Sequence, residues 1–410
     1  MTTAMTLQQG FTLKSGTFIK NRLFKSAMSE QLGDPQHNPL PGLATLYRAW
    51  ALGGLGLSIS GNIMVARDAL GEPKNVVLDK QSDLSEFKNW AQQGSLNDTQ
   101  FWAQLNHPGK QTPNFINKEP VAPSAIALTN GLEKGFNTPR ALTESEILNI
   151  IGQFQTSAKL AKQVGFTGVQ IHGAHGYLVN QFLSPRHNQR DDQWGGSIEN
   201  RMRFVLSIYQ AIRAEVGDDF PIGIKLNSAD FMRGGFTEAE SMQVVKALGD
   251  AGIDQIEISG GTYESPTMTG HKVKKSTLER EAYFLSYAEK VRAITDTPLV
   301  VTGGFRSSKA MLSALQSNAT DFIGLARPMS LDTQLPNKLM ASDAHKISLP
   351  KLTTGVKAID RMAMLEITWY EAQLARIAKQ QQPKANLGTW PVFFKTIYGA
   401  GIYAFRKRRA

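Results

Sequence analysis

The stretch GVQIHGAHGYLVNQFLSP, residues 168–185, decides how this chain is interpreted. Its first residues, 168–171, form an apolar run that is typical of a buried parallel strand. The run ends on His172, His175 follows three residues later, and Tyr177 comes next. A strand that delivers polar, titratable side chains at its C-terminal end is what an active site in a barrel requires. We therefore expect this strand end to lie at the catalytic face of the fold.

The chain on both sides of this stretch repeats a short apolar strand followed by an amphipathic helix. We expect strands at 23–27, 56–60, 100–105, 168–172, 221–227, 254–259, 298–302 and 320–325. We expect helices near 41–52, 84–94, 143–164, 197–216, 237–251, 279–295, 307–317 and 333–341. Two helix starts carry the capping-box pattern, Thr143 with Glu146 and Thr237 with Glu240.

Strands that alternate with helices, and that are apolar almost throughout, predict an α/β fold with a parallel sheet covered by helices. For a chain of 410 residues, eight such units favour a closed (β/α)8 TIM barrel over an open doubly wound sheet. The glycine fingerprint of a dinucleotide-binding fold is missing after the first strand, because Gly54-Leu55-Gly56 precedes its strand.

Three further segments are expected around the barrel. Residues 11–24 alternate around Lys14-Ser15-Gly16, which predicts an N-terminal hairpin that closes one end. The long connections 108–140 and 261–278 follow the third and sixth strands, so they are expected to cap a substrate at the C-terminal face.

The pattern changes beyond residue 345. A helix is expected around 356–379, followed by a Gln/Pro/Lys break and an aromatic tail that ends in Arg and Lys residues. We therefore divide the chain into a barrel, 1–344, and a C-terminal helical extension, 345–410. The extension is expected to pack on the barrel or on a neighbouring subunit, so a homo-oligomer is one interpretation.

Composition narrows the class of protein. The chain is 41% hydrophobic and 20% charged, as in soluble globular proteins. It has no cysteine, which excludes disulfides, thiolate-bound zinc and iron–sulfur clusters. No secretory signal or membrane span is recognisable, so we expect a cytoplasmic protein. The net charge of +10 is scattered except at 406–409, and no basic stripe alternates with aromatics, so nucleic acid is not an expected partner.

The ends of the last two predicted strands carry an anion-binding pattern. Gly303-Gly304 follows the seventh strand and Ala326-Arg327 ends the eighth. Glycines let backbone N–H groups approach phosphate oxygens and arginine adds a charged fork, which is a recurrent phosphate site in this fold. An ordinary tight turn is the alternative for the glycines. The combination with Arg327 favours phosphate.

Lys225 and the histidine pair are the other candidate functional groups. Lys225 lies within an apolar strand, where a buried ammonium needs a partner or a function; the alternative is a structural lysine that bridges a carboxylate. His172 and His175 suggest a metal site, packed structural histidines, or two donors for a carbonyl or anionic oxygen. Tyr177 favours the last, because a phenol serves as a proton donor. The sequence has no G-x-S-x-G motif and no cysteine nucleophile, so acyl transfer is not expected.

These residues occur in a specific pattern. The segment HGAHGYLVNQFLSPRHNQRDDQWGGSIENRMRF, with AQLNHPGK before it and VVTGGF and GLARP after it, closely resembles the old yellow enzyme family of FMN-dependent oxidoreductases. The resemblance runs from about residue 7 to about residue 341. It implies a (β/α)8 barrel with FMN at its C-terminal mouth, NADH or NADPH as hydride donor, and a small-molecule substrate.

The resemblance also implies a role for each matching residue. The isoalloxazine would be lined by Ser26, Ala27, Met28 and Gly61, with Ser29 near its C4 carbonyl and Gln104 bonded to its pyrimidine edge. Lys225 would stabilise negative charge at N1 and C2 of the reduced flavin. The phosphate would be held by Gly303, Gly304, Ala326 and Arg327. His172 and His175 would bind a substrate carbonyl oxygen, and Tyr177 would donate the proton.

Three positions depart from the family pattern. Many members have arginine where this chain has Lys225, some have a redox-tuning cysteine at Ser29, and proline is common at Ala27.

The resemblance implies an ene-reductase that transfers hydride from NAD(P)H through FMN to an activated alkene. The alternatives are an oxidase or nitro-reductase with the same flavin, and a non-catalytic flavoprotein that contacts an anionic membrane through 392–409. Packing of these aromatics on the barrel or across a dimer is the favoured interpretation of the tail.

Overall fold

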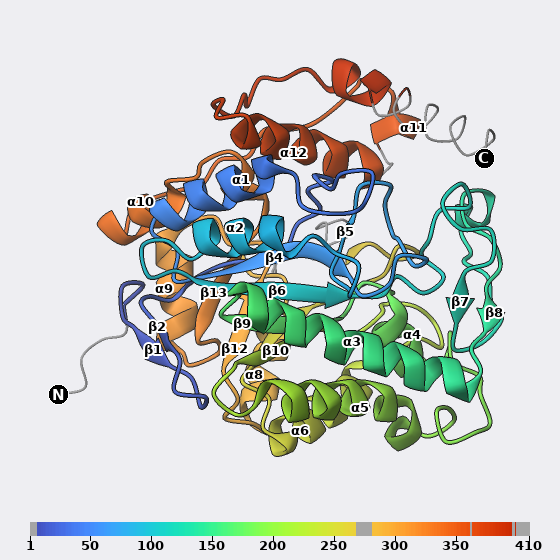
Figure 1. The fold of residues 1–410 in the computed structure, drawn as a ribbon. Helices are drawn as coiled ribbons and strands as arrows, with labels where there is room; N and C mark the ends of the chain where they lie inside the picture. The colour runs from blue at the N-terminus through green and yellow to red at the C-terminus, as the bar shows by residue number, and fades with distance from the viewer. Residues whose placement is uncertain (1–5, 268–280, 361–362, 396–397, 399–410) are drawn as a thin grey trace.

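The computed structural model describes residues 6–267, 281–360, 363–395 and 398. Eight parallel strands form a ring in which each is hydrogen-bonded to its neighbours, and pairing of the first with the second closes it (Figure 1). The strands are β3 (Leu23–Lys25), β4 (Leu57–Met64), β6 (Gln100–Asn106), β9 (Gly168–Gly173), β10 (Ile222–Asn227), β11 (Gln255–Ser259), β12 (Leu299–Thr302) and β13 (Phe322–Leu325). The predicted (β/α)8 barrel is confirmed.

Helices surround the ring, as Figure 1 shows. The predicted ones are α1 (Pro41–Leu52), α2 (Leu84–Gly94), α3 (Glu144–Val164), α5 (Ile198–Val216), α6 (Glu238–Ala251), α8 (Leu285–Arg292), α9 (Ser308–Gln316) and α10 (Leu335–Ala341). The predicted start of α8 at 279 was wrong for its described part, since the helix begins only at Leu285. Helix α4 (Leu178–Leu183) was not predicted, because such a short helix, buried on all sides, shows no amphipathic period.

The predicted capping boxes hold two of the helix starts in place. At α3 and at α6, the threonine hydroxyl accepts from the backbone N–H three residues on, and the glutamate there accepts from the threonine N–H. This pairing satisfies backbone donors that have no partner within the helix. Both helices end at a glycine with positive φ, Gly165 (97°) and Gly252 (93°), so the chain turns directly into the next strand.

The N-terminal hairpin closes the end of the barrel opposite the catalytic face. Strands β1 (Phe11–Thr12) and β2 (Phe18–Ile19) pair antiparallel. Leu13 and Ile19 are buried in a cluster with Trp102 and Phe322, which lie on barrel strands. The hairpin thus prevents access from this end, and in Figure 1 it lies at the end from which β4 and β6 start.

The catalytic face is built from longer connections. β4 contains a bulge, in which Ser60 and Gly61 stand opposite the single residue Ala103 of β6. The short strand β5 (Val76–Val77) extends the sheet beside the end of β4. In the connection 108–140, the strands β7 (Val121–Ala122) and β8 (Arg140–Ala141) pair in parallel, and the 3-10 turn η1 (Leu132–Lys134) lies between them. The predicted loop 261–278 falls partly outside the described residues.

The C-terminal extension packs on the barrel. It contains α11 (Lys357–Asp360) and α12 (Ala363–Ala378), and α12 lies against α1 and the 3-10 turn η3 (Arg327–Ser330) (Figure 1). Trp369 of α12 is buried with Tyr370 and Val392, whereas Trp390, Phe394 and Tyr398 of the tail are exposed, so the packing of the tail aromatics stays a prediction. The residues 396–397 and 399–410 of the tail lie outside the described residues. None of the helices in the described part of the chain has the length and apolar character that a bilayer crossing requires.

Candidate active site

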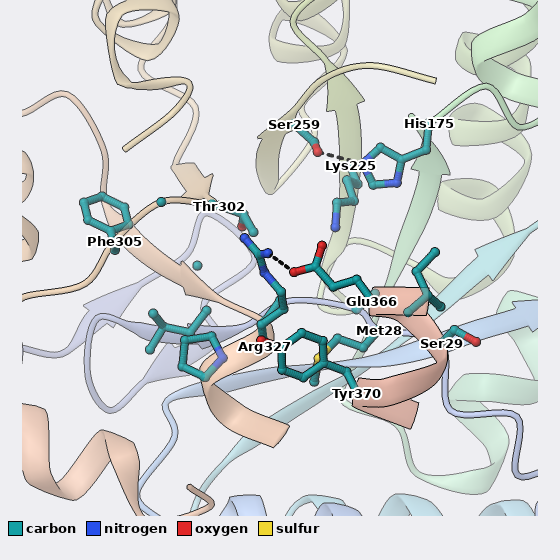
Figure 2. A pocket seen from close by; sticks show the side chains of 18 of the residues that line it. Met28, Ser29, His175, Lys225, Ser259, Thr302, Phe305, Arg327, Glu366 and Tyr370 are labelled. Atoms are coloured by element: carbon teal, nitrogen blue, oxygen red, sulfur yellow. Dashed lines mark hydrogen bonds and ion pairs between the residues drawn. The ribbon is translucent and has the colours of Figure 1, made fainter. Parts of the chain in front are cut away.

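A single cavity opens at the C-terminal ends of the barrel strands and brings together nine of the predicted site residues (Figure 2). They are Ala27, Met28, Ser29, His175, Lys225, Gly303, Gly304, Ala326 and Arg327. Ser259 of β11 also lines the cavity, so residues from six strand ends that are far apart in the chain meet at one place. The wall on the other side comes from α12, through Glu366, Ile367, Tyr370 and Leu374. The sequence analysis did not anticipate this contribution of the extension.

The other five predicted residues, Ser26, Gly61, Gln104, His172 and Tyr177, do not line this cavity. The Ser26 hydroxyl lies 2.7 Å from that of Thr302, which does line it. The backbone N–H of Gly61 donates to the Glu30 carboxylate (3.1 Å). Gln104 donates from Nε2 to Gln170 (2.7 Å), while its Oε1 is buried with no hydrogen-bond partner. This acceptor is free for a donor that the protein does not itself supply.

The glycines at the end of β12 form a cradle that larger residues would fill. Gly303 and Gly304 have positive φ values of 103° and 99°. A Cβ on Gly304 would lie 1.6 Å from the Glu281 carbonyl oxygen, so glycine is required there. Beside them, the Arg327 guanidinium forms an ion pair with Glu366 of α12 (Figure 2). Arg327 therefore already holds an anionic group, the kind of partner that the phosphate prediction requires.

Lys225 has the carboxylate partner of one interpretation and the cavity position that the other requires. Its ammonium points into the cavity (Figure 2), and it lies 3.1 Å from Oε1 of Glu257 on the adjacent strand β11. Glu257 is fully buried and also accepts hydrogen bonds from Thr302 (2.7 Å) and Gln170 (2.9 Å). The lysine is thus paired with a carboxylate, and the pair is located at the cavity.

The two histidines are neutral hydrogen-bonding groups. Burial lowers the pKa of His172 and of His175 well below the usual range, and the positive charge of Lys225 acts in the same direction. Their rings meet edge to face with centroids 5.2 Å apart. The backbone N–H of Ala174 donates to Nδ1 of His172 (3.3 Å), so the ring proton is on Nε2. His175 pairs through Nε2 with the Ser259 hydroxyl (2.7 Å).

Tyr177 stands next to this pair. Its ring meets that of His172 with centroids 4.8 Å apart, and its hydroxyl lies 2.8 Å from that of Tyr263 in the connection after β11. Burial raises the pKa of both phenols, so both stay protonated at neutral pH. A protonated phenol beside two neutral imidazoles provides a proton donor next to two hydrogen-bond donors.

A pair of carboxylates lies on the other side of the cavity, where α12 meets the barrel. The hydroxyl of Ser29 donates to Glu72, and Gln31 donates to both oxygens of Glu371 of α12 (3.1 and 3.0 Å). Burial first, and the charge of Glu72 second, raise the pKa of Glu371 to about 8. One proton is therefore held at this contact near neutral pH.

This contact makes stability depend on pH. The folded protein keeps a proton on Glu371 that the unfolded chain, with its ordinary value of 4.5, would release. The contribution of this group is therefore complete below pH 4.5 and decreases as pH rises toward about 8. We expect Glu371→Gln to reduce the fall in melting temperature across this range, and the buried carboxyls of Glu72, Glu30 and Asp230, whose pKa values are also raised, to account for the rest. Glu215→Gln is the control, because its hydrogen bond with Lys159 lowers the pKa of Glu215 out of the range. Equal slopes in wild type and Glu371→Gln would contradict the assignment.

Four residues that contact the predicted site residues were not predicted from the sequence. Glu257 had a usable signal, because it is a lone charge between Ile256 and Ile258, as Lys225 is between apolar neighbours. Tyr263 lies in a connection without a pattern. Glu366 and Glu371 lie on a helix outside the barrel, and nothing in their spacing indicates that α12 reaches the cavity. The metal interpretation of the histidines gains no third ligand, since the described residues contain no group of three His, Cys, Asp or Glu that could hold a metal ion.

Comparison with known proteins gives consistent matches. Residues 6–345 match the model of the family described as NADH:flavin oxidoreductase / NADH oxidase. The chain is 36% identical over 362 residues to the NADH-dependent flavin oxidoreductase iliE of Hypocrea jecorina, which covers 82% of this chain and 89% of that protein.

Solved structures give the same architecture. A complex of 2-naphthoyl-CoA reductase with 2-naphthoyl-CoA has a TM-score of 0.76 at 27% identity, covering 82% of this chain and 52% of that longer one. The old yellow enzyme homologue from Zymomonas mobilis has a TM-score of 0.71 at 23% identity, covering 84% of this chain and 95% of that one, and this likeness concerns the fold alone.

Proposed function

We propose that this protein, which belongs to the NADH:flavin oxidoreductase / NADH oxidase family of the old yellow enzymes, reduces the C=C bond of α,β-unsaturated carbonyl compounds. Membership of this family makes it an FMN-dependent oxidoreductase that uses NADH or NADPH. The observation that carries this proposal is the group of two neutral imidazoles and one protonated phenol beside the cavity. These groups suit a substrate whose oxygen gains negative charge and whose carbon takes up a proton.

The residues present fit FMN. Gly303, Gly304 and Arg327 offer backbone approach and a cation for its phosphate. Lys225 points into the same cavity, and the unpartnered Oε1 of Gln104 is available for an N–H of the pyrimidine edge. The predicted assignments of Ser26, Ala27, Met28, Ser29, Gly61 and Ala326 to the flavin stay proposals.

FMN supplies hydride transfer between NAD(P)H and the substrate. The protein supplies orientation, charge and a proton. His172, with its proton on Nε2, and His175 would donate hydrogen bonds to the substrate carbonyl oxygen and stabilise the charge that develops on it. Tyr177 would give its phenolic proton to the α-carbon, and Tyr263 is placed to donate a hydrogen bond to the Tyr177 oxygen as that proton leaves.

Two measurements test the proposed function. Purified protein should be yellow and release FMN on denaturation. The reduced enzyme should then be reoxidised by cyclohexenone faster than by oxygen or a nitroaromatic compound in stopped-flow experiments. Faster reoxidation by oxygen or by the nitro compound would favour the oxidase or nitro-reductase alternative. A panel of enones with NADH and with NADPH would define the substrate class and the donor.

Glu366 and the FMN phosphate would compete for Arg327, so substitutions of Arg327 and of Glu366 should change the affinity for FMN in opposite directions. We expect Arg327→Ala to weaken FMN binding by roughly 10- to 100-fold, because a hydrogen bond to a charged group contributes about 1.5–3 kcal/mol. Glu366→Gln, which removes the competing charge but keeps the size, should tighten FMN binding.

The measurement is the dissociation constant of FMN, determined by fluorescence titration of the deflavinated protein. Lys338→Ala is the control, because Lys338 is an exposed residue of α10 that pairs with Asp332. Weaker binding in both Arg327→Ala and Glu366→Gln would show that the two residues hold the site together rather than compete.

A further inference from the structure

Two buried lysines, near the C-terminal ends of β3 and β10, each lie beside a buried carboxylate, in two separate pairs. Lys25 lies 3.9 Å from Glu30 and donates to the Tyr47 hydroxyl (2.8 Å). Lys225 lies 3.1 Å from Glu257. The side chain of Lys225 is 5% exposed and that of Glu257 is fully buried. Of these four groups, Lys225 lines the cavity.

Both carboxylate oxygens of Glu257 have partners. Its Oε1 accepts from the Thr302 hydroxyl (2.7 Å) and faces the Lys225 ammonium, and its Oε2 accepts from the Gln170 amide (2.9 Å). The strand register places Lys225 directly opposite Glu257, so the pair is fixed by the backbone of β10 and β11.

We propose that Glu257 is the counter-charge of Lys225 and that it sets the reduction potential of the bound flavin. This inference rests on the proposed position of Lys225 at the N1 and C2 edge. Two electrons and one proton from a reductant convert FMN to its reduced anion, with the proton on N5 and the charge at that edge. A lone lysine would stabilise this charge strongly. Pairing with Glu257 cancels much of the lysine's field, which is a long-range effect in a site of low dielectric constant.

The test compares single and double variants by titration against a redox dye at pH 6, below the pKa of about 7 of the neighbouring Lys25. Glu257→Gln should raise the ratio of affinities for reduced over oxidised FMN by about tenfold, which for a two-electron couple is about 30 mV. Lys225→Met should lower it. The double variant, which is neutral like the original pair, should return close to the wild-type potential.

A matched control lies on the same strand. Asp254 is buried just before the start of β11, where it pairs with Arg213 (2.6 Å). Asp254→Asn removes a buried carboxylate at the opposite end of the barrel, so it should lower stability and leave the potential unchanged. Glu257→Asp, whose shorter side chain draws the carboxylate away from Lys225, gives a second variant with a smaller shift of the same sign as Glu257→Gln if the latter folds poorly.

The outcomes separate this inference from the proposed function. If Glu257→Gln and Glu257→Asp both leave the potential unchanged, or shift it in the same direction as Lys225→Met, the inference is wrong even where enones are reduced. If the potentials shift as expected but no enone is reduced, the counter-charge stands and the proposed substrate class fails. A shift of equal size in Asp254→Asn would also overturn the inference.

Discussion

Replacing both His172 and His175 by alanine is expected to lower the rate of enone reduction by roughly 10³-fold or more, because each donor to a developing oxyanion contributes about 10²–10³-fold. Both imidazoles are neutral in the folded protein, so the loss concerns hydrogen bonds and not a charge. FMN should remain bound, since the residues proposed for its phosphate and pyrimidine edge are untouched. The measurements are single-turnover reoxidation by cyclohexenone and the FMN content of the purified variant.

A control variant distinguishes this from general damage to the protein. His345 lies outside the cavity, in the segment after α10, and His345→Ala should leave turnover unchanged. The single variants should each be affected less than the double one. A double variant that reduces cyclohexenone at the parental rate would remove the assignment of the histidine pair to the substrate oxygen.

Replacing Tyr177 by phenylalanine should slow the oxidation of the reduced enzyme by an enone by roughly 10²–10⁴-fold, the usual contribution of a positioned proton donor. Its reduction by NADH or NADPH should be almost unchanged, because that half-reaction needs no proton from a phenol. The raised pKa of Tyr177 predicts that it remains protonated from pH 6 to 9, so the enone half-reaction should show no titration of this phenol in that range. Stopped-flow measurement of the two half-reactions separates the effects.

Tyr263→Phe serves as the graded comparison. It removes only the hydroxyl that pairs with Tyr177 at 2.8 Å, so the enone half-reaction should slow by less than in Tyr177→Phe. If Tyr177→Phe slows both half-reactions equally, or if Tyr263→Phe has the larger effect, Tyr177 is not the proton donor to the substrate.

The architecture was predictable because it follows from local patterns. Seven of the eight barrel strands were placed within two residues of their observed ends, since parallel strands buried on both faces are apolar almost throughout, and β4 runs four residues beyond its predicted end at 60. The helix starts at Thr143 and Thr237 were predictable because a capping box is a short-range arrangement of a few residues. The positions of His175, Lys225, Gly304 and Arg327 around one cavity then follow from the barrel itself.

The sequence by itself therefore determined the fold, the family and the strand ends that carry polar groups. The tertiary structure alone decided which partners these groups meet. The register of β10 against β11 pairs Lys225 with Glu257, and the packing of α12 on α1 brings Glu366 to Arg327. Such contacts join residues tens of positions apart, and the physical reason they were missed is that no periodicity along the chain specifies the register between strands or the docking site of a terminal helix.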